Sequence, residues 1–476
     1  MRTLLFDGHG VHQPGVGAQI AYRIETTADG GVEVDPTELA RLAIECLTAI
    51  HGQMSERGLR PAAVAFCTFW HCFLGVSGEG QPTTSIIHLF DTRSREQVRR
   101  LAELVDARAS HARTGCVLHT SYWPAKLLWL AQHQSASVAA TRWWMSFGEY
   151  LFLRLFGRPA TTTSMASASG IWNQNANDYD DTMLALLPVD RGQLAPPDAM
   201  DEPVRDLLPE FRSQWPLLAD VPWFPSLGDG ACNNLGSGCV APDTFSLMVG
   251  TSGAMRAVVE APRLEVPAGL WCYRADRRRL VLGGALSNGG EVFAWMQRTL
   301  ALPSPEEVER ALAAMVPGDH GLTLLPLFAG ERSTGWRPDA RAAITGLGLH
   351  TRPIDILRAA LEAVALRFRL IYEILAERLG EPRQVIASGG GLLHSPAWTQ
   401  MMADALGRPV VTCTEPEATG RGAAMFVLER LGAIASLSDL PPQTGAVFQP
   451  NPAHGQAYAE LFARQRRLYR KLFEED

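Results

Sequence analysis

The chain has 476 residues, enough for two or three domains that each bury a core. Hydrophobic residues make up 46% and charged residues 20%, which excludes general disorder. The net charge of −7 argues against a dedicated nucleic-acid binder, because such proteins carry a basic face. No apolar run reaches the ~18 residues of a membrane span, and MRTLLFDGHG is too short and acidic for a signal peptide.

Cysteine spacing and missing motifs narrow the class further. Eight cysteines occur without a CxxC pair, so we expect a reduced, cytoplasmic protein with core thiols and no zinc site. The patterns GxxxxGK[ST], HExxH and GxSxG are absent. A Walker-type phosphate loop, a zinc protease and an α/β-hydrolase therefore have no support.

The first half alternates strands and helices, which is typical of an α/β fold. Residues 2–6 and 18–25 predict two strands of a hairpin, separated by a glycine-containing turn. Apolar residues at helical spacing predict a helix over 39–50, and a buried strand follows over 62–69. The stretch 186–225 is rich in proline and charge, so we expect it to be largely loop.

A second alternation of strands and turns begins near Thr244. We therefore place a domain boundary near residue 240, giving domains 1–240 and 241–476. The clearest helix covers 354–379 and ends at Gly380. It is followed by a strand, a glycine turn, a helix and a strand, over 384–388, 389–391, 396–406 and 409–413.

Four segments are candidates for chemistry, and the first is Gly228-Asp229-Gly230-Ala231. A carboxylate between two glycines can approach a ligand closely, because glycine has no side chain to obstruct it. Asp229 could accept the proton of a substrate hydroxyl during phosphoryl transfer. Asp-Gly is also a common turn pair, and a solvated turn is the commoner explanation of the motif taken alone.

Two glycine-rich turns form the second and third candidates. Gly250-Thr251-Ser252-Gly253 follows an apolar run and could present backbone N–H groups and hydroxyls to phosphate oxygens. A tight hairpin turn is the alternative. The run Gly389-Gly390-Gly391 follows Ser388 at a strand-to-helix corner, where backbone could pack flat against a nucleotide. It does not match the GxGxxG fingerprint.

The fourth candidate combines aromatic and polar side chains in two neighbouring segments. Trp70 and His71 belong to TFWH, and Asp91 and Arg93 belong to FDTR. Such residues suit a polyhydroxylated ligand, because they offer an apolar face with directional hydrogen bonds. The alternatives are that the aromatic rings are core and that Asp91 and Arg93 form a surface pair.

Taken together and in order, these segments resemble the FGGY carbohydrate kinases, which include gluconokinases, xylulokinases and glycerol kinases. The resemblance covers about residues 2–432. It is carried by CTFWHCFLGV, HLFDTRS, GDGACNNLGSG, MVGTSGAMR, LFAGERSTGW with PDARAAITGL, ASGGGLLHSPAWTQMMADALGRPV and EATGRGAAMFVLERLG. It implies two actin-like, ribonuclease-H-like (ASKHA) α/β domains with an interdomain cleft. It also implies phosphorylation of a sugar, polyol or sugar-acid hydroxyl with ATP and Mg²⁺.

The resemblance assigns roles to the candidate residues. Asp229 matches the catalytic base, and it also belongs to the substrate site with Trp70, His71, Asp91 and Arg93. The nucleotide-binding residues that it implies lie in the second half; they are Gly250, Thr251, Ser252, Gly253, Gly389, Gly390, Gly391 and Ser395. No metal ligand is assigned.

One departure from the family pattern is large. The family opens with a strand ending in Asp-x-Gly-Thr-Ser/Thr, which holds the transferring phosphate and magnesium, and here Met1 falls after that motif. Asp7 lies in the hairpin turn that follows and no Thr or Ser comes after it, so it is not a substitute. We therefore expect a chain truncated relative to the family. A misassigned start and a genuine loss of activity are both open.

Two functions follow from the sequence. One is a carbohydrate kinase, and the other is a non-catalytic sugar- or nucleotide-binding relative that lost the first phosphate-binding motif. We expect a small-molecule sugar or sugar-acid ligand, no nucleic acid, no membrane and a possible homodimer. The segment TFWH leans away from xylulose and leaves gluconate, another sugar acid or another pentulose open.

Overall fold

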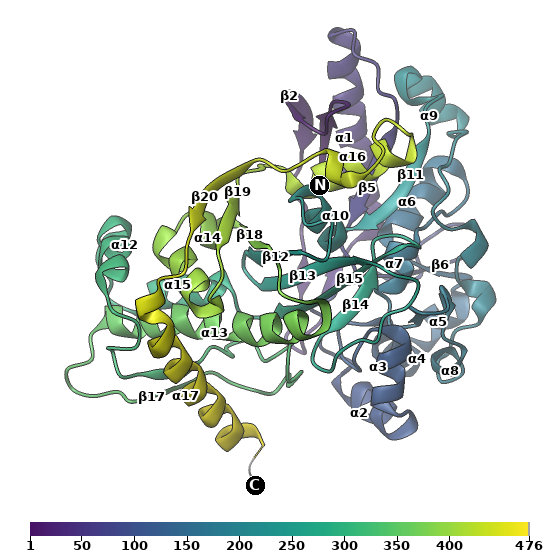
Figure 1. The fold of residues 1–476 in the computed structure, drawn as a ribbon. Helices are drawn as coiled ribbons and strands as arrows, with labels where there is room; N and C mark the ends of the chain where they lie inside the picture. The colour runs from purple at the N-terminus through teal and green to yellow at the C-terminus, as the bar shows by residue number, and fades with distance from the viewer. Residues whose placement is uncertain (475–476) are drawn as a thin grey trace.

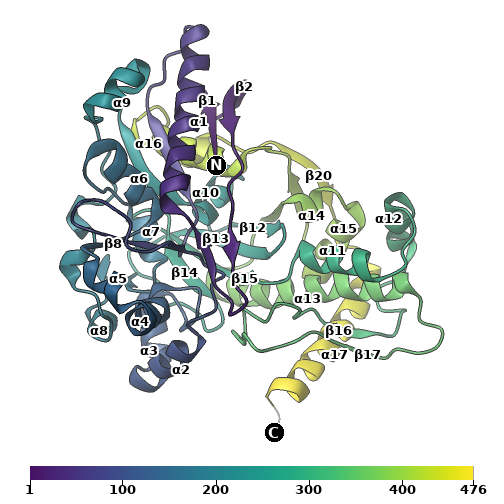
Figure 2. The same cartoon turned by 180° about the vertical axis from the view of Figure 1, so that it is seen from behind.

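A computed structural model describes residues 1–474, which fold into two α/β halves (Figures 1 and 2). The first half contains β1 Arg2–Phe6, β2 His12–Gln19, β3 Glu25–Thr26, β4 Val32–Val34, α1 Pro36–Glu56, β5 Val64–Thr68, β6 Leu74–Val76, β7 Ile86–Ile87, α2 Arg95–Leu104, α3 Ala107–Thr114, α4 Trp123–His133, α5 Ser135–Ala140, β8 Trp143–Met145, α6 Phe147–Phe156, α7 Thr163–Ser167, β9 Trp172–Asn173, β10 Asp178–Tyr179, α8 Asp181–Leu184, α9 Pro209–Gln214, β11 Trp223–Gly228 and α10 Asp229–Gly236.

The second half contains β12 Thr244–Val249, β13 Gly253–Glu260, β14 Trp271–Arg274, β15 Arg279–Leu286, α11 Gly290–Thr299, α12 Pro305–Ala314, β16 Thr323–Leu325, β17 Ala343–Thr345, α13 Pro353–Leu379, β18 Gln384–Ser388, α14 Gly390–Leu393, α15 Pro396–Leu406, β19 Val410–Cys413, α16 Ala418–Arg430, β20 Thr444–Phe448 and α17 Gly455–Phe473. The predicted boundary near residue 240 falls in the loop between α10 and β12. Within residues 1–474, no helix has the length and apolar content that crossing a membrane requires.

The second half is organised around one seven-stranded sheet in the order β14-β15-β13-β12-β18-β19-β20. Strands β12, β18 and β19 are parallel, and the outer strands are antiparallel. The long helix α13 packs on this sheet, because its apolar stripe includes Leu357, Leu361, Val364 and Phe368 in the main buried cluster. The carboxyl ends of β12 and β18 lie side by side, which places the turns after them next to each other.

The strands of the first half form several small sheets. Strand β1 pairs only with β2, and β5 pairs only with β11, in parallel. Within residues 1–474, no further strand joins the facing edges of β1 and β5. The N-terminal ammonium group of Met1 donates to the carbonyl of Ile20 at 2.9 Å, on the β2 side of this hairpin.

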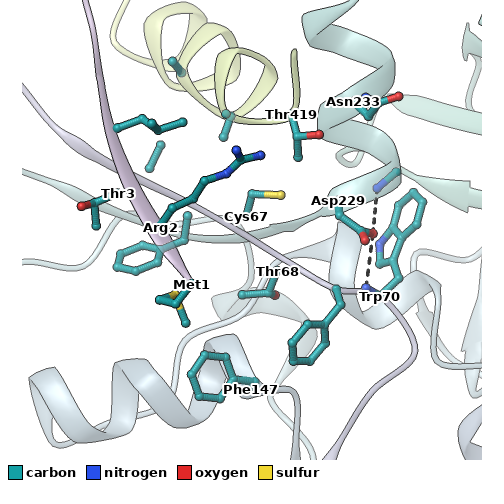
Figure 3. A pocket seen from close by; sticks show the side chains of 18 of the residues that line it. Met1, Arg2, Thr3, Cys67, Thr68, Trp70, Phe147, Asp229, Asn233 and Thr419 are labelled. Atoms are coloured by element: carbon teal, nitrogen blue, oxygen red, sulfur yellow. Dashed lines mark hydrogen bonds between the residues drawn. The ribbon is translucent and has the colours of Figure 1, made fainter. Parts of the chain in front are cut away.

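A cavity of about 1230 Å³ extends from the space between β1 and β5 toward the second half. Apolar residues of α1, such as Leu47 and Ile50, line it together with Ala423 and Val427 of α16. In Figure 3, Met1 and the β1 residues Arg2 and Thr3 lie along one side of the cavity, and Cys67 and Thr68 of β5 lie along another. The cavity therefore joins the space between the two small sheets to the site described below.

Helix α16 belongs to the second half in sequence, yet it packs on α10 and β5 of the first half (Figure 1). Two glycines permit this close crossing. A Cβ at Gly236 would lie 1.7 Å from the carbonyl oxygen of Ala418, and one at Gly422 would lie 1.9 Å from that of Cys232. The crossing ties the two halves together beside the carboxyl end of β11, where Asp229 begins α10.

Candidate active site

Asp229 is the first residue of α10, directly after the buried strand β11. Its carboxylate lines the cavity and accepts hydrogen bonds from the backbone N–H of Gly230 at 2.8 Å and of Trp70 at 3.4 Å (Figure 3). The positive end of α10 also favours a negative charge at this position. Strand, turn and helix together hold one carboxylate at the wall of the cavity.

The ring of Trp70 explains why glycine stands on both sides of Asp229. A Cβ at Gly228 would lie 1.8 Å from Nε1 of Trp70, and one at Gly230 would lie 2.5 Å from Cζ3 of the same ring. The indole therefore covers both sides of Asp229, and only glycine fits beneath it. Trp70 is itself fixed, because Nε1 donates to the carbonyl of Ser164 at 3.0 Å.

Trp70 and His71 both line the same cavity as Asp229. Nδ1 of His71 lies 2.7 Å from the carbonyl oxygen of Ala168, so this nitrogen carries the proton and donates. Burial lowers the pKa of His71 to about 3, which keeps the ring neutral near pH 7. Nε2 is then free to accept a hydrogen bond from a ligand hydroxyl, and the rings of Tyr122 and Tyr273 lie edge-on to the imidazole.

The structure does not bring Asp91 and Arg93, the other predicted substrate contacts, to the cavity wall. Asp91 is 1% exposed and accepts from the backbone N–H of Val32 at 3.0 Å. The Arg93 guanidinium pairs with Asp91 at 2.6 Å and with Glu33 at 2.5 Å, and it lies 4.2 Å from the centre of the Trp129 ring. Asp91 and Arg93 therefore form an ion pair with each other and with Glu33 of β4, whereas the resemblance placed both residues in the substrate site.

Two of the predicted nucleotide-binding residues, Ser252 and Gly389, line the cavity. Ser252 lies in the turn between β12 and β13, and Gly389 follows β18, so both lie at neighbouring strand ends. Gly389 has a φ of +87° and a Cβ there would lie 2.4 Å from the carbonyl oxygen of Val249. The predicted turns therefore meet at one edge of the sheet and reach the same cavity as Asp229.

The remaining predicted nucleotide-binding residues do not line the cavity; they are Gly250, Thr251, Gly253, Gly390, Gly391 and Ser395. The backbone N–H of Gly290 donates to the carbonyl of Gly250 at 2.7 Å, and that of Gly289 donates to Thr251 at 3.1 Å. Ser395 caps α15, because its Oγ accepts from the N–H of Trp398, and it also donates to Glu309 at 2.8 Å. Ser395 does not line the cavity and serves the start of α15 instead.

Two cavity residues were not predicted from the sequence, Arg256 of β13 and Arg332 in the segment GERSTGW. Arg256 interrupts the otherwise apolar run Ala254–Val259, and a charge within a buried strand is a signal that the sequence carries. Its guanidinium faces the ring of Trp271 with 6.0 Å between the guanidinium carbon and the ring centre. Trp271 in turn stacks on Tyr273 at 4.3 Å.

Desolvation dominates the electrostatics of this site. Burial raises the pKa of Asp229, while the hydrogen bond from Gly230 and the charge of Arg256 act in the opposite direction. Burial lowers the pKa of Arg256 to about 10, and Asp229 is the carboxylate that partly offsets this shift. A carboxyl with a raised pKa beside a buried cation is typical of a functional site.

Comparisons with known proteins match both halves of the chain. Residues 1–236 match the N-terminal domain of the FGGY family of carbohydrate kinases, and residues 245–428 match its C-terminal domain. The chain belongs to the FGGY family of carbohydrate kinases. It is therefore a phosphotransferase with the two-domain, actin-like fold of that family, as the sequence predicted.

Individual relatives of this FGGY kinase cover most of its length. Gluconokinase from Bacillus subtilis (strain 168) is 26% identical over 449 residues, covering 92% of this chain and 87% of the relative. The crystal structure of gluconate kinase from Lactobacillus acidophilus matches with a TM-score of 0.90 and 25% identity, covering 99% of this chain and 95% of that one. Ligand-bound xylulose kinase from Lactobacillus acidophilus has a TM-score of 0.90 and 26% identity, with coverage of 100% and 96%.

This coverage does not support the expected truncation relative to the family. The chain spans 87% of the Bacillus subtilis gluconokinase and 96% of the Lactobacillus acidophilus xylulose kinase. Within residues 1–474, β1 and β5 belong to two separate two-stranded sheets.

Proposed function

We propose that this FGGY kinase phosphorylates a hydroxyl group of a sugar, polyol or sugar acid at the expense of ATP, with Asp229 as the general base. One observation carries the proposal. The Asp229 carboxylate faces a cavity that is also lined by Ser252 and Gly389, the two turns suited to phosphate. An acceptor hydroxyl beside Asp229 would then face the phosphate-binding turns across the cavity.

The residues of the first half suit an acceptor rich in hydroxyl groups. Two backbone N–H groups hold Oδ1 of Asp229. Oδ2 is thereby kept at a fixed place, where it can accept the hydroxyl proton. Neutral His71 offers Nε2 as an acceptor to a second hydroxyl. The ring of Trp70 supplies an apolar wall next to both groups.

The residues of the second half suit a nucleotide, which supplies the phosphoryl group when bound. Within residues 1–474, no group of three or more His, Cys, Asp or Glu side chains could hold a metal ion. Magnesium usually keeps several waters and takes one or two carboxylates plus phosphate oxygens. We therefore propose that the nucleotide phosphates and water hold it, since Asp229 must stay free to accept the hydroxyl proton.

The variant Gly390→Val tests the nucleotide position. A Cβ at Gly390 would meet only His394, at 3.5 Å, so the protein should fold with the larger side chain. Valine would nevertheless cover the backbone on which we place the adenosine. We expect isothermal titration calorimetry to show at least ~10-fold weaker ADP binding, which corresponds to about 1.4 kcal/mol.

Gly455→Val is a suitable control, because it lies at the start of α17, has a helical backbone, and a Cβ there has no atom within 4 Å. Its ADP affinity should equal that of the unsubstituted protein. Unchanged ADP affinity in Gly390→Val would show that the nucleotide binds elsewhere.

The pH dependence of kcat/KM should report Asp229. The base acts only when it is deprotonated, and burial raises its pKa, so the rate should fall with decreasing pH at a midpoint above 3.8. His71 stays neutral down to about pH 3 and adds no step to this acid limb. We expect a limb with the slope of one proton; a midpoint at or below 3.8 would contradict the assigned environment of Asp229.

ADP release in a coupled assay over a panel of sugars, polyols and sugar acids tests the proposed function. Release that depends on one acceptor supports a kinase. Ligand binding without ADP release on any acceptor would favour the alternative, a non-catalytic relative. The separate sheets of β1 and β5 are the observation that keeps this alternative in view.

All eight cysteines are free thiols, in keeping with the reducing cytoplasm that we propose as the location of the protein.

A further inference from the structure

Arg256 is a buried cation with unused hydrogen-bond donors. Its side chain is 8% exposed and it lines the same cavity as Asp229. Nε and Nη1 are buried and have no hydrogen-bond partner among residues 1–474. An arginine that has lost its water and gained no partner costs stability, so such a group usually awaits a ligand.

Arg332 repeats this arrangement on a separate segment of the chain. It lines the cavity, and its buried Nε also lacks a partner in the described residues. The charge of Arg332 lowers the pKa of Arg256 less than burial does, and Tyr273 acts in the opposite direction on the pKa of both arginines. Tyr273 donates to or accepts from Tyr122 at 2.6 Å, so the tyrosines satisfy each other.

The cavity therefore carries more positive than negative charge beside the proposed acceptor. Arg256 and Arg332 form no ion pair with any described residue, and Asp229 is the one carboxylate that acts on Arg256. Gly230 and Trp70 both engage Oδ1 of Asp229, and Oδ2 is the oxygen that we propose accepts the hydroxyl proton. One further negative charge, supplied by a ligand, would balance the site.

The geometry points to a carboxylate subsite: we propose that Arg256, assisted by Arg332, binds the carboxylate of a sugar-acid acceptor. The inference rests on the proposed function, and it narrows the acceptor to an aldonate-type acid. Arginine binds a carboxylate through two parallel N–H···O bonds. The unpartnered Nε shares one edge of the guanidinium with Nη2, and this edge is the fork that Arg256 offers.

The surroundings of the two arginines favour the acceptor over the nucleotide phosphates. Trp271 and Tyr273 lie beside Arg256, and Trp70 contacts Tyr273 with 5.0 Å between ring centres. These rings also border His71, on the side where we place the acceptor. The phosphate-binding turns instead offer small residues and backbone, with Ser252 and Gly389 at the cavity wall.

The test compares an aldonate with its neutral counterpart. D-gluconate and D-glucitol differ in a carboxylate against a CH₂OH group, and both have the hydroxyl groups that a kinase could use. For Arg256→Gln we expect kcat/KM for gluconate to fall ~30–10³-fold, mainly through KM, as a charge-assisted bidentate contact is lost. The loss with glucitol, which makes no carboxylate contact, should be at least about tenfold smaller, and the KM for ATP should change less than about threefold.

Arg256→Lys and Arg256→Met sharpen the result. Lysine keeps the charge and loses the fork, so it should recover part of the gluconate affinity. Methionine removes an unpaired buried charge, so the unliganded variant should melt at the same or a higher temperature while calorimetry shows no gluconate binding. Exposed Arg298, which pairs with Glu291, provides the control Arg298→Gln.

Each outcome decides the inference. Equal losses for gluconate and glucitol, or a raised KM for ATP with an unchanged KM for gluconate, would overturn the carboxylate subsite and leave the kinase proposal intact. A lower melting temperature of Arg256→Met would assign the residue a structural role and also overturn it. Absence of phosphorylation of any acceptor by the unsubstituted protein, with gluconate binding still lost in Arg256→Gln, would sink the proposed function and keep the subsite.

Discussion

Replacing Asp229 by Asn should lower kcat by ~10²–10⁴-fold while the protein keeps its fold and its ligands. Asparagine has nearly the same size and can still accept the hydrogen bonds from Gly230 and Trp70. It cannot take a proton from the acceptor hydroxyl, so the loss should appear in kcat more than in KM. Steady-state kinetics with the preferred acceptor measures this directly.

Asp7 is a matched control, because it also lines the cavity and accepts backbone hydrogen bonds from His9 and Val11. It lies in the turn between β1 and β2, far in sequence from the candidate site. Asp7→Asn should keep turnover within about threefold of the unsubstituted protein. If Asp229→Asn retained near-full turnover, or if Asp7→Asn lost as much, Asp229 would not be the base.

Gly228→Ala should destabilise the protein by about 1–3 kcal/mol, as overpacking in a buried site does. The added Cβ would fall 1.8 Å from Nε1 of Trp70, and the indole cannot retreat without giving up its bond to Ser164. The same displacement would disturb the backbone N–H of Trp70 that holds Asp229. Urea unfolding followed by fluorescence measures the free energy of unfolding.

Gly52→Ala in α1 is the corresponding control, since a Cβ there has no atom within 4 Å. It should leave the stability unchanged or raise it by up to about 1 kcal/mol, because alanine favours helix over glycine. Placing Gly228→Ala in a Trp70→Ala background should shrink the penalty, since the opposing ring is gone. A full penalty without the ring would show that the clash with Trp70 is not its cause.

Much of the fold follows from periodicity in the sequence. Helix α13 and strand β18 occur where apolar spacing predicts them, and Gly380 ends α13 with a φ of +86°. Strand β2 spans His12–Gln19, whereas the prediction was 18–25. The earlier start is possible because an edge strand tolerates Pro14 without losing a ladder hydrogen bond. In the same way Pro225 lies within β11, where the pairing with β5 shifts register.

The site was only partly predictable. The glycine turns made Asp229, Ser252 and Gly389 candidates, and the resemblance to the family assigned their roles, because each turn taken alone is also typical of a plain turn. Burial depends on three-dimensional neighbours. The sequence left a surface pair of Asp91 and Arg93 open as an alternative, but it could not show that this pair is buried and includes Glu33. The positive φ of +67° at His71 likewise has no signature in the sequence.

The central claim is that this FGGY kinase transfers a phosphoryl group from ATP to a hydroxyl of a carbohydrate acceptor through Asp229. The most direct test is ³¹P nuclear magnetic resonance of a reaction containing the protein, ATP, Mg²⁺ and D-gluconate or another acceptor from the panel. We predict a phosphate monoester of the acceptor in equal amount to ADP, and neither product with Asp229→Asn. Inorganic phosphate in place of the monoester, or equal product from Asp229→Asn, would contradict the claim.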